Sequence, residues 1–312
     1  MNIAKPYFSE VTDPRVTGRC LHLLSDILMI GLCTYLTGGT DYEDMRMFAL
    51  ERGSELGDML SLPNGVPSTD TFERVFGRIH PAELECCLRS YGKDILNDLS
   101  EKQIVIDGKK QCGASPTSRG NKGLYILNAW VSENRFCIAQ EKVEDKSNEI
   151  TAIPEILSDI DISDAVVSID AMGTQREIAG ILPARDYLME ETLESWKNLS
   201  TIVKIESIRE IKDRITRDIR YYISDEKEPK ASYYAALARG HWSIENQLHW
   251  HLDVTFKEDE CRARKGFASQ NLSVLRKIAL HIVSEQKDKL SMKRRLYKAA
   301  LDINYLKKLL EF

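Results

Sequence analysis

The sequence predicts an α/β domain with a mixed sheet, preceded by an all-α domain. Residues before position 100 carry apolar side chains at helical spacing, short β-branched runs begin near residue 102, and helical spacing returns from Ala231 onward. In the second part a strand, a hairpin, a helix, a strand, a helix, two strands and a helix follow one another, which is typical of an α/β domain. We therefore place a helical N-terminal domain at residues 1–99 and the α/β domain at residues 100–312.

The first domain is predicted to consist of helices separated by turns. LHLLSDILMIGLCTYL is apolar at helical spacing, and Thr40 or Asp41 is the expected cap of the next helix. Asp70 and Glu73 have the spacing of a capping box, and Pro81 separates that helix from another. Short helices with tight turns are typical of small DNA-binding domains and also of helical bundles in general.

The second domain is predicted to begin with strands. QIVID and AVVSID are β-branched runs that each end on an aspartate, Asp107 and Asp170. Between them, LYILNAWV and RFCIAQEKV predict a hairpin, and EITAIPEILSDI predicts a helix that Pro154 fits poorly. A helix over residues 175–182 and strands in STIVKIESI and DIRYYIS are expected next, before the chain becomes helical again.

Composition excludes several classes of protein. The 312 residues are 43% hydrophobic and 29% charged, with a formal net charge of −5, which excludes a disordered, collagen-like or coiled-coil chain. None of the seven cysteines forms a C-x-x-C pair, so neither a disulfide framework nor a thiolate zinc site is indicated, and we expect a reduced, cytoplasmic protein. No apolar run suits a signal peptide or a membrane span, so no membrane partner is expected.

Charge is distributed unevenly along the chain. Residues 1–98 contain nine Lys or Arg and 15 Asp or Glu, whereas residues 260–312 contain 13 Lys or Arg and five Asp or Glu. A basic end can bind phosphate, and it can equally be a solvated helix face. Charge alone leaves both interpretations open.

The two strand-end aspartates are candidates for a metal site. Functional side chains gather at the carboxyl ends of strands in open α/β sheets, and two carboxylates there repel each other unless a cation lies between them. Mg²⁺ prefers oxygen ligands and keeps waters for a phosphate substrate. A third candidate is Glu245, one position away from the expected buried stripe of Ile244, Leu248 and Leu252. Each acid alone has an ordinary explanation as a turn former or a solvated residue, but their combination favours function.

Several long stretches of the sequence are characteristic of one family. They include DPRVTGRCLHLLSDILMIGL, LPNGVPSTDTFERVFGRI, VIDGKK, EKVEDKSNEITAIPEIL, VSIDAMGTQREIA and HWSIENQLHWHLDVTFKED. Through them nearly the whole chain resembles the DDE transposases of the H-repeat-associated (ISAs-type) insertion-sequence family. The resemblance implies a ribonuclease-H-like catalytic core behind the helical domain. It assigns the two aspartates and the glutamate of the family to Asp107, Asp170 and Glu245, as catalytic residues and metal ligands.

The resemblance also implies a reaction and partners. Two Mg²⁺ ions about 3.5–4 Å apart, for which Mn²⁺ can substitute, would activate the attacking water or 3′-hydroxyl and stabilise the leaving oxygen. The expected substrate is double-stranded DNA at terminal inverted repeats and at the target, cleaved and rejoined by a homodimer on DNA. A bacterial, nucleoid-associated protein of the cytoplasm is implied. The three carboxylates are expected within roughly 4–8 Å of one another.

Six residues are candidates for DNA contact. They are Lys109, Lys110, Lys146, Asn148, Trp242 and Asn246. For the first two, a phosphate contact and a solvated position are equally acceptable. Trp242 and Trp250 flank the glutamate and could stack on an unpaired base, although core packing is the role we expect more.

The sequence departs from the family between the second aspartate and the glutamate. Asp170 and Glu245 are only 75 residues apart, so the chain lacks several tens of residues that family members carry there. A transposase by descent with weakened or absent activity is therefore one hypothesis, and a non-catalytic DNA-binding protein is the alternative. A zinc site of His241, Glu245 and His249 is a third interpretation, but ligands spread over two helical turns rarely converge on one ion.

Overall fold

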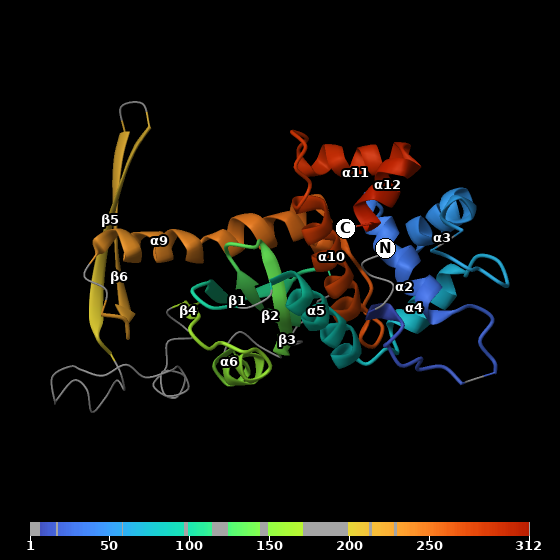
Figure 1. Ribbon diagram of the computed structural model, residues 1–312, viewed down its shortest axis with the longest axis horizontal. Helices are drawn as coiled ribbons and strands as arrows, with labels where there is room; N and C mark the ends of the chain where they lie inside the picture. Colours follow the sequence, from blue (N-terminus) through green and yellow to red (C-terminus); the bar gives the residue numbers. More distant parts are fainter. Residues whose placement is uncertain are drawn as a thin grey trace.

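The computed structural model describes residues 7–16, 18–57, 59–96, 99–113, 124–143, 149–170, 199–211, 214–227 and 230–311. Figure 1 shows a four-stranded sheet in the middle of the molecule, a group of helices from both ends of the chain on one side, and a two-stranded hairpin at the opposite end. The helix α9 (Ala231–His241) leads from the hairpin back to the sheet. The expected helix over residues 175–182 lies outside the described residues.

The N-terminal region is helical, as predicted. It contains α2 (Leu24–Leu36), α3 (Tyr42–Arg52), the short 3₁₀ helix η1 (Gly53–Leu56), α4 (Thr69–Phe76) and α5 (Pro81–Leu96). Nearly every residue of α2 is buried, because α10 (Ala268–Ser284), which is equally buried, packs against it. Helices from the two ends of the chain thus share one core with the sheet.

The caps of these helices test the predicted starts. Asp41 caps α3, and its carboxylate accepts a hydrogen bond from the backbone N–H of Asp44 at 2.9 Å, as expected. The capping box is wrong by position: Ser68, not Asp70, is the N-cap of α4 and accepts from the N–H of Thr71. Pro81 opens α5, where its missing N–H costs no hydrogen bond.

The central sheet has the order β3-β2-β1-β4. Its strands are β1 (Gln103–Gln111), β2 (Leu124–Val131), β3 (Phe136–Val143) and β4 (Val166–Ile169). Strand β1 is antiparallel to β2 and parallel to β4, so the sheet is mixed. Helices pack against it, and most residues of β1, β2 and β3 are buried, including the apolar runs that open β1 and β3.

Helix α6 (Glu149–Ser158) packs against β2 and β3 and contains Pro154 in its interior. The poor fit that we expected for this proline does not end the helix. An interior proline costs about 3 kcal/mol, and four apolar neighbours are at most 5% exposed, which offsets that cost. They are Ala152, Ile153, Ile156 and Leu157.

A second sheet consists of the hairpin β5 (Thr201–Ile211) and β6 (Arg214–Ser224). After α9 the chain forms two π-helical turns, η3 (Ile244–His249) and η4 (His251–Thr255), and the 3₁₀ turn η5 (Glu258–Glu260). Helices α11 (Met292–Leu301) and α12 (Ile303–Leu310) follow α10. The architecture confirms an all-α N-terminal region and an α/β core with a mixed sheet. Every helix in the described ranges falls short of the length and apolar character of a membrane span.

Candidate metal centre

Asp107 and Asp170 lie side by side on adjacent parallel strands. The parallel register pairs Ile106 of β1 with Ile169 of β4; Asp107 is the next residue of β1, and Asp170 directly follows the end of β4. The prediction that β1 ends on Asp107 is wrong, because β1 continues to Gln111 in its antiparallel ladder with β2. The parallel ladder with β4 does end there, so Asp107 still occupies the carboxyl edge that predicted a site.

Glu245 reaches this edge from the first π-helical turn. The predicted stripe of Ile244, Leu248 and Leu252 is buried, with each residue at most 1% exposed. Glu245 lies beside the stripe with its side chain 59% exposed. π-Helical turns are rare and concentrate at functional sites, and here two of them carry the chain past β1.

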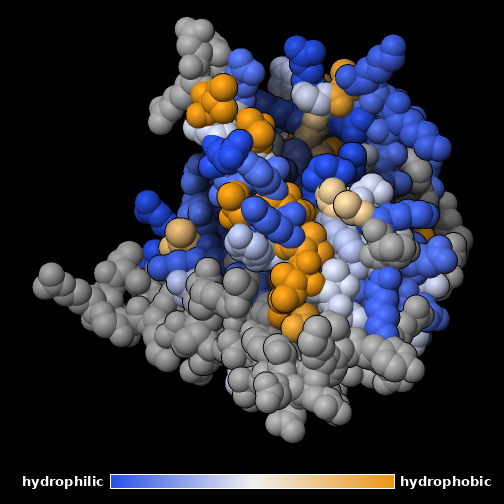
Figure 2. All heavy atoms as spheres, turned by 90° about the vertical axis from the view of Figure 1, so that its left-hand side faces the viewer, coloured by the Kyte–Doolittle hydropathy of each residue, from blue (hydrophilic) through white to orange (hydrophobic). Residues whose placement is uncertain are grey.

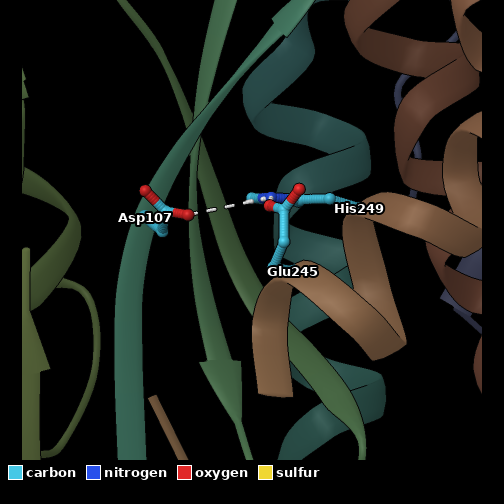
Figure 3. A group of neighbouring side chains, drawn as sticks. All are labelled: Asp107, Glu245 and His249. Atoms are coloured by element: carbon cyan, nitrogen blue, oxygen red, sulfur yellow. Dashed lines mark hydrogen bonds and ion pairs between the residues drawn. The ribbon is translucent and has the colours of Figure 1, made fainter. Parts of the chain in front are cut away.

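Asp107, Glu245 and His249 converge into one cluster, which we call the acidic cluster (Figure 3). One potential ligand atom from each residue lies within 4.8 Å of the others. The His249 Nδ1 atom is 3.0 Å from Glu245 Oε2 and 3.7 Å from Asp107 Oδ2. For the first and third predicted acids, the expected proximity therefore holds. Asp170 acts electrostatically on Asp107 and is half-buried beside it.

Hydrogen bonds fix the tautomer of His249. The Asn128 Nδ2 atom lies 3.4 Å from Nε2 of the imidazole and also donates to the carbonyl of Ile126. Since an amide nitrogen can only donate, this contact favours Nε2 as the acceptor and Nδ1–H as the donor. Nδ1–H then donates to the carboxylate of Glu245. His249 holds this carboxylate toward β1 and does not offer Nδ1 as a metal ligand in this tautomer.

The acids of the cluster have opposite pKa shifts. Burial raises the pKa of Asp107 above its ordinary value and Asp170 adds to the rise, although His249, Gly108 N–H and His241 counteract it. The hydrogen bond from His249 lowers the pKa of Glu245, more than its partial burial raises it. The two shifts have different causes: burial of the carboxylate dominates for Asp107, and the hydrogen bond from His249 dominates for Glu245.

The donor set suits a hard divalent cation. Carboxylate oxygens from β1 and from the π-helical turn face each other, and Glu245 is open to solvent, so that waters or a phosphate can complete the coordination of Mg²⁺. Asp170 is outside this group of converging ligand atoms, and it acts on Asp107 electrostatically. The zinc interpretation is not supported among the described residues. The His241 Nδ1 atom lies 3.2 Å from the Ser168 hydroxyl, and His241 is outside the group of converging ligands.

A second charged group, the lysine cluster, lies further along the same strand and helix. The Lys109 Nζ atom is 2.6 Å from Asp253, 3.3 Å from Glu258 and 3.3 Å from Asp259. Burial tends to lower the pKa of Lys109, but these three carboxylates together raise it. The expected phosphate contact of Lys109 is contradicted, because its side chain is only 9% exposed and its charge is already balanced.

The remaining candidates for DNA contact have mixed positions. Lys110 is exposed with its ammonium 5.8 Å from the centre of the Tyr125 ring. Trp242 and Trp250 are 45% and 51% exposed, so core packing was the wrong expectation for both. Asn246 is exposed on the same helical segment, and its side chain donates to the carbonyl of Trp242. Lys146 and Asn148 lie outside the described residues.

Sequence reasoning missed two members of the site. It weighed His249 only as a zinc ligand, and it gave Asn128 no role. The spacing of four residues between Glu245 and His249 was a usable signal, because residues four apart face each other on a helix. Asn128 carried a weaker signal, as a polar residue within the apolar run LYILNAWV.

Comparisons with known proteins agree on one family. The family described as "Transposase DDE domain" matches residues 98–282, and a domain described as "DDE_Tnp_1-associated" matches residues 5–92. YhhI of Escherichia coli K12, named as a candidate transposase associated with the H repeat, is 30% identical over 96% of this chain and 95% of its own length. YncI of Escherichia coli O157:H7, also named as a candidate transposase, is 30% identical over 97% and 93% of the two chains.

Two further features of these comparisons concern length and fold. The alignments with YhhI and YncI run over 362 and 364 positions, more than the 312 residues of this chain, so both relatives contain residues without a counterpart here. Among solved structures, the piggyBac transposase synaptic complex with hairpin DNA matches with a TM-score of 0.40 and 11% identity. The match covers 99% of this chain and 78% of that one. At this TM-score and identity, the likeness supports no statement about this chain.

Proposed function

The chain belongs to the DDE transposase family, and from this premise we propose that it cleaves DNA strands at terminal inverted repeats and joins them to target DNA. The observation that carries the proposal is the convergence of Asp107 and Glu245. They lie far apart in the sequence, yet their oxygens meet within 4.8 Å at the edge of the sheet. An enzyme of phosphoryl transfer needs such a group of carboxylates to hold divalent cations against a phosphate.

In this proposal each acid has a defined task. Asp107, Asp170 and Glu245 hold the divalent cations, Mg²⁺ or Mn²⁺. When bound, such a metal pair supplies activation of the attacking hydroxyl and stabilisation of the leaving oxygen. His249 keeps the Glu245 carboxylate turned toward Asp107 by its Nδ1–H hydrogen bond. This orientation matters because outer hydrogen bonds fix the direction of metal ligands.

The DNA is proposed to lie along the exposed side of the helical segment that carries Glu245. Trp242 and Asn246 are exposed there, and an aromatic ring can stack on an unpaired base. Lys110 is the exposed cation nearest along β1 and is proposed to contact a phosphate. Lys146 and Asn148 remain candidates for contact with DNA. A homodimer on DNA, in the bacterial cytoplasm with the nucleoid, completes the proposal.

The shorter length favours one alternative, a non-catalytic DNA-binding protein derived from a transposase. The sheet of the described residues ends at β4, whose four residues are half-buried, and the two long relatives carry additional residues. A catalytic sheet that has lost a strand would leave backbone groups unpaired at its edge. This alternative predicts DNA binding that is unaffected by loss of the acids.

The test is a cleavage and strand-transfer assay with labelled duplexes from both flanks of the coding sequence. The proposal predicts nicked and joined products that need Mg²⁺ or Mn²⁺, and a loss of at least about 100-fold in rate for Glu245→Gln. Glu260→Gln, which removes an exposed carboxylate of the 3₁₀ turn η5, is the matched control and retains activity. Salt-dependent binding without products in every variant would establish the non-catalytic alternative.

A further inference from the structure

The hairpin β5–β6 is an isolated two-stranded sheet. Among the described residues, each of its strands pairs only with the other, over the full register from Thr201–Ser224 to Ile211–Arg214. An isolated hairpin is at best marginally stable in water and requires packing on at least one face. One face of this hairpin contacts α9 and the residue that follows it, whereas the other face is exposed.

The inner face of the hairpin is anchored to α9. The Tyr234 hydroxyl of α9 donates to the Glu226 carbonyl at 2.9 Å and lies 3.3 Å from the Thr201 hydroxyl. The guanidinium of Arg220 lies 4.5 Å from the centre of the Trp242 ring. These contacts hold the base of the hairpin against the helix and leave the opposite face directed away from it.

The outer face is apolar and exposed. Six large apolar side chains of this face are each between 42% and 68% exposed, and they make up a stripe that Figure 2 shows along the hairpin. They are Ile202, Ile208, Ile215, Ile219, Tyr221 and Ile223. Exposed apolar surface gathered on one element marks an interaction site, whereas single exposed apolar residues are ordinary.

The charges within this face are self-complementary along β5. Ile202, Lys204, Glu206 and Ile208 alternate along the strand and share the outer face. When a second copy of the strand runs antiparallel across a two-fold axis at the level of Ile205, Lys204 meets Glu206 of that copy. Ile202 then meets Ile208, and each contact occurs twice, which is the requirement for a two-fold interface.

We propose that the outer face of β5–β6 binds the same face of a second copy of this chain, with the strands antiparallel, and forms a dimer without DNA. The apolar side chains supply the driving force, because burial of apolar surface gains about 25 cal/mol per Å². The charge pattern supplies the register. Lys204 forms no ion pair with another described residue, whereas Glu206 has one oxygen 2.7 Å from Arg217 of the same face.

DNA is a less suitable occupant of this face. Glu206 and Glu210 balance the charges of Lys204 and Arg217 on it, and isoleucines occupy the positions between them, so the face has no excess of positive charge to attract phosphates. The proposal concerns the hairpin alone and does not depend on the acidic cluster. It can therefore be tested by measuring the oligomeric state of the chain without metal or DNA.

The test begins with the mass of the full chain, measured by light scattering and sedimentation over a range of concentrations without DNA. The proposal predicts twice the mass of the monomer. Ile219→Asp alters an exposed side chain and is expected to give a folded monomer. Asp218→Lys is the matched control on the inner face of the same strand, where its side chain is 60% exposed, and it is expected to leave the dimer intact.

Charge reversal tests the two-fold register directly. Lys204→Glu alone and Glu206→Lys alone each place like charges opposite each other twice and are expected to weaken dimerisation about tenfold or more. A mixture of the two single variants restores opposite charges in both pairs, so it is expected to form a heterodimer. The double variant, K204E with E206K, is expected to dimerise with itself.

Three results would overturn the proposal. The first is a wild-type monomer at all concentrations. The second is failure of the two single variants to rescue each other while each remains folded by circular dichroism. The third is a monomer whose hairpin becomes protected from hydrogen exchange only when duplex DNA is added, which would assign the surface to DNA.

Discussion

Two charged clusters join β1 to the same helical segment, and only one of them contains its own cation. In the lysine cluster, the Nζ atom of Lys109 lies within 3.3 Å of three carboxylates. One of these carboxylates, that of Glu258, is buried away from solvent. In the acidic cluster, the ion-pair partner that Asp107 and Glu245 share is His249, and neither acid forms a salt bridge with a lysine or arginine of the described residues. The β1 residues of the two clusters, Asp107 and Lys109, are only two positions apart on the same strand.

This difference teaches how the chain separates structure from function. A buried carboxylate that pairs with a lysine of the same chain has its charge balanced without a bound metal, and the ion pair holds two elements together. Carboxylates that meet without a cation cost free energy until a cation binds, and they are retained where that binding is useful. The lysine cluster thus holds the helical segment against β1, and this places Glu245 of the acidic cluster close to Asp107.

The largest expected effect is that of Lys109→Met on stability. This substitution leaves the fully buried Glu258 with only Arg276 at 3.8 Å as a salt-bridge partner, while Asp253 and Asp259 lose their cation. Breaking a buried ion pair on one side costs about 3–5 kcal/mol, measured as the free energy of unfolding in urea. Lys110→Met is the control, because Lys110 is exposed. Equal losses in the two variants would contradict a structural role for the lysine cluster.

Glu85 sharpens the comparison, because it is a buried acid with an amide partner. Gln140 Nε2 donates to it at 3.3 Å, and Lys277 contacts Gln140 instead of the acid. Burial raises the pKa of Glu85 from 4.5 to about 7. Because the pKa is higher in the folded chain, Glu85 contributes to stability below pH 4.5, and this contribution is lost as pH rises through 7. The lost contribution amounts to about 3 kcal/mol.

Urea unfolding between pH 4.5 and pH 8 measures the contribution of Glu85. We expect wild-type stability to fall over this range by about 3 kcal/mol more than that of Glu85→Gln, which has no proton to lose at this position. Identical pH profiles of the two proteins would mean that Glu85 is ionised without penalty, and the comparison between acids with and without a cation would lose its basis.

The next effect is stabilisation by metal. At a Mn²⁺ concentration 100 times the dissociation constant, a cation that binds only the folded chain adds about 2.7 kcal/mol to the free energy of unfolding. Thermal unfolding with Mn²⁺ should show this gain in the wild type and little of it in Glu245→Gln. Asp253→Asn, from the lysine cluster, should keep the gain. Loss of the gain in Asp253→Asn but not in Glu245→Gln would exchange the roles of the clusters.

The smallest effect concerns Asp107 in the absence of metal. Burial raises its pKa above 3.8, so its contribution to stability is present below that pH and declines as pH rises through the shifted pKa. Asp107→Asn should therefore gain stability relative to the wild type above pH 4 with EDTA. The expected gain is smaller than the Glu85 effect, and saturating Mg²⁺ should reverse it. A pH-independent difference between the two proteins would contradict the raised pKa.

Much of the fold followed from local patterns. The strands and the buried stripe of Ile244, Leu248 and Leu252 were readable because side chains on one face recur at a fixed spacing. Asp107, Asp170 and Glu245 were found as candidates because acids at two strand ends and beside a buried helical stripe together favour a metal site, although each alone has an ordinary explanation. Local pattern could not show that β1 continues past Asp107, since the antiparallel ladder with β2 is set by tertiary pairing.

Contacts across the chain were beyond prediction from the sequence. Lys109 reads as a solvated lysine until Glu258 and Asp259, about 150 residues later, are known to surround it. The exposure of Trp242 and Trp250 likewise depends on what packs against the π-helical turns, and a hydrophobic residue type does not reveal that. These two errors concern contacts between distant residues, whereas those at the start of α4 and the end of β1 concern the limits of an element.

The central claim is that the acidic cluster takes a divalent cation and the lysine cluster does not. Anomalous diffraction from crystals of the full chain grown with saturating Mn²⁺ tests it most directly. We predict an anomalous peak bounded by the carboxylates of Asp107 and Glu245, with Asp170 in reach, and no peak beside Asp253, Glu258 or Asp259. A peak beside Lys109, or none at Asp107 and Glu245, would contradict the account.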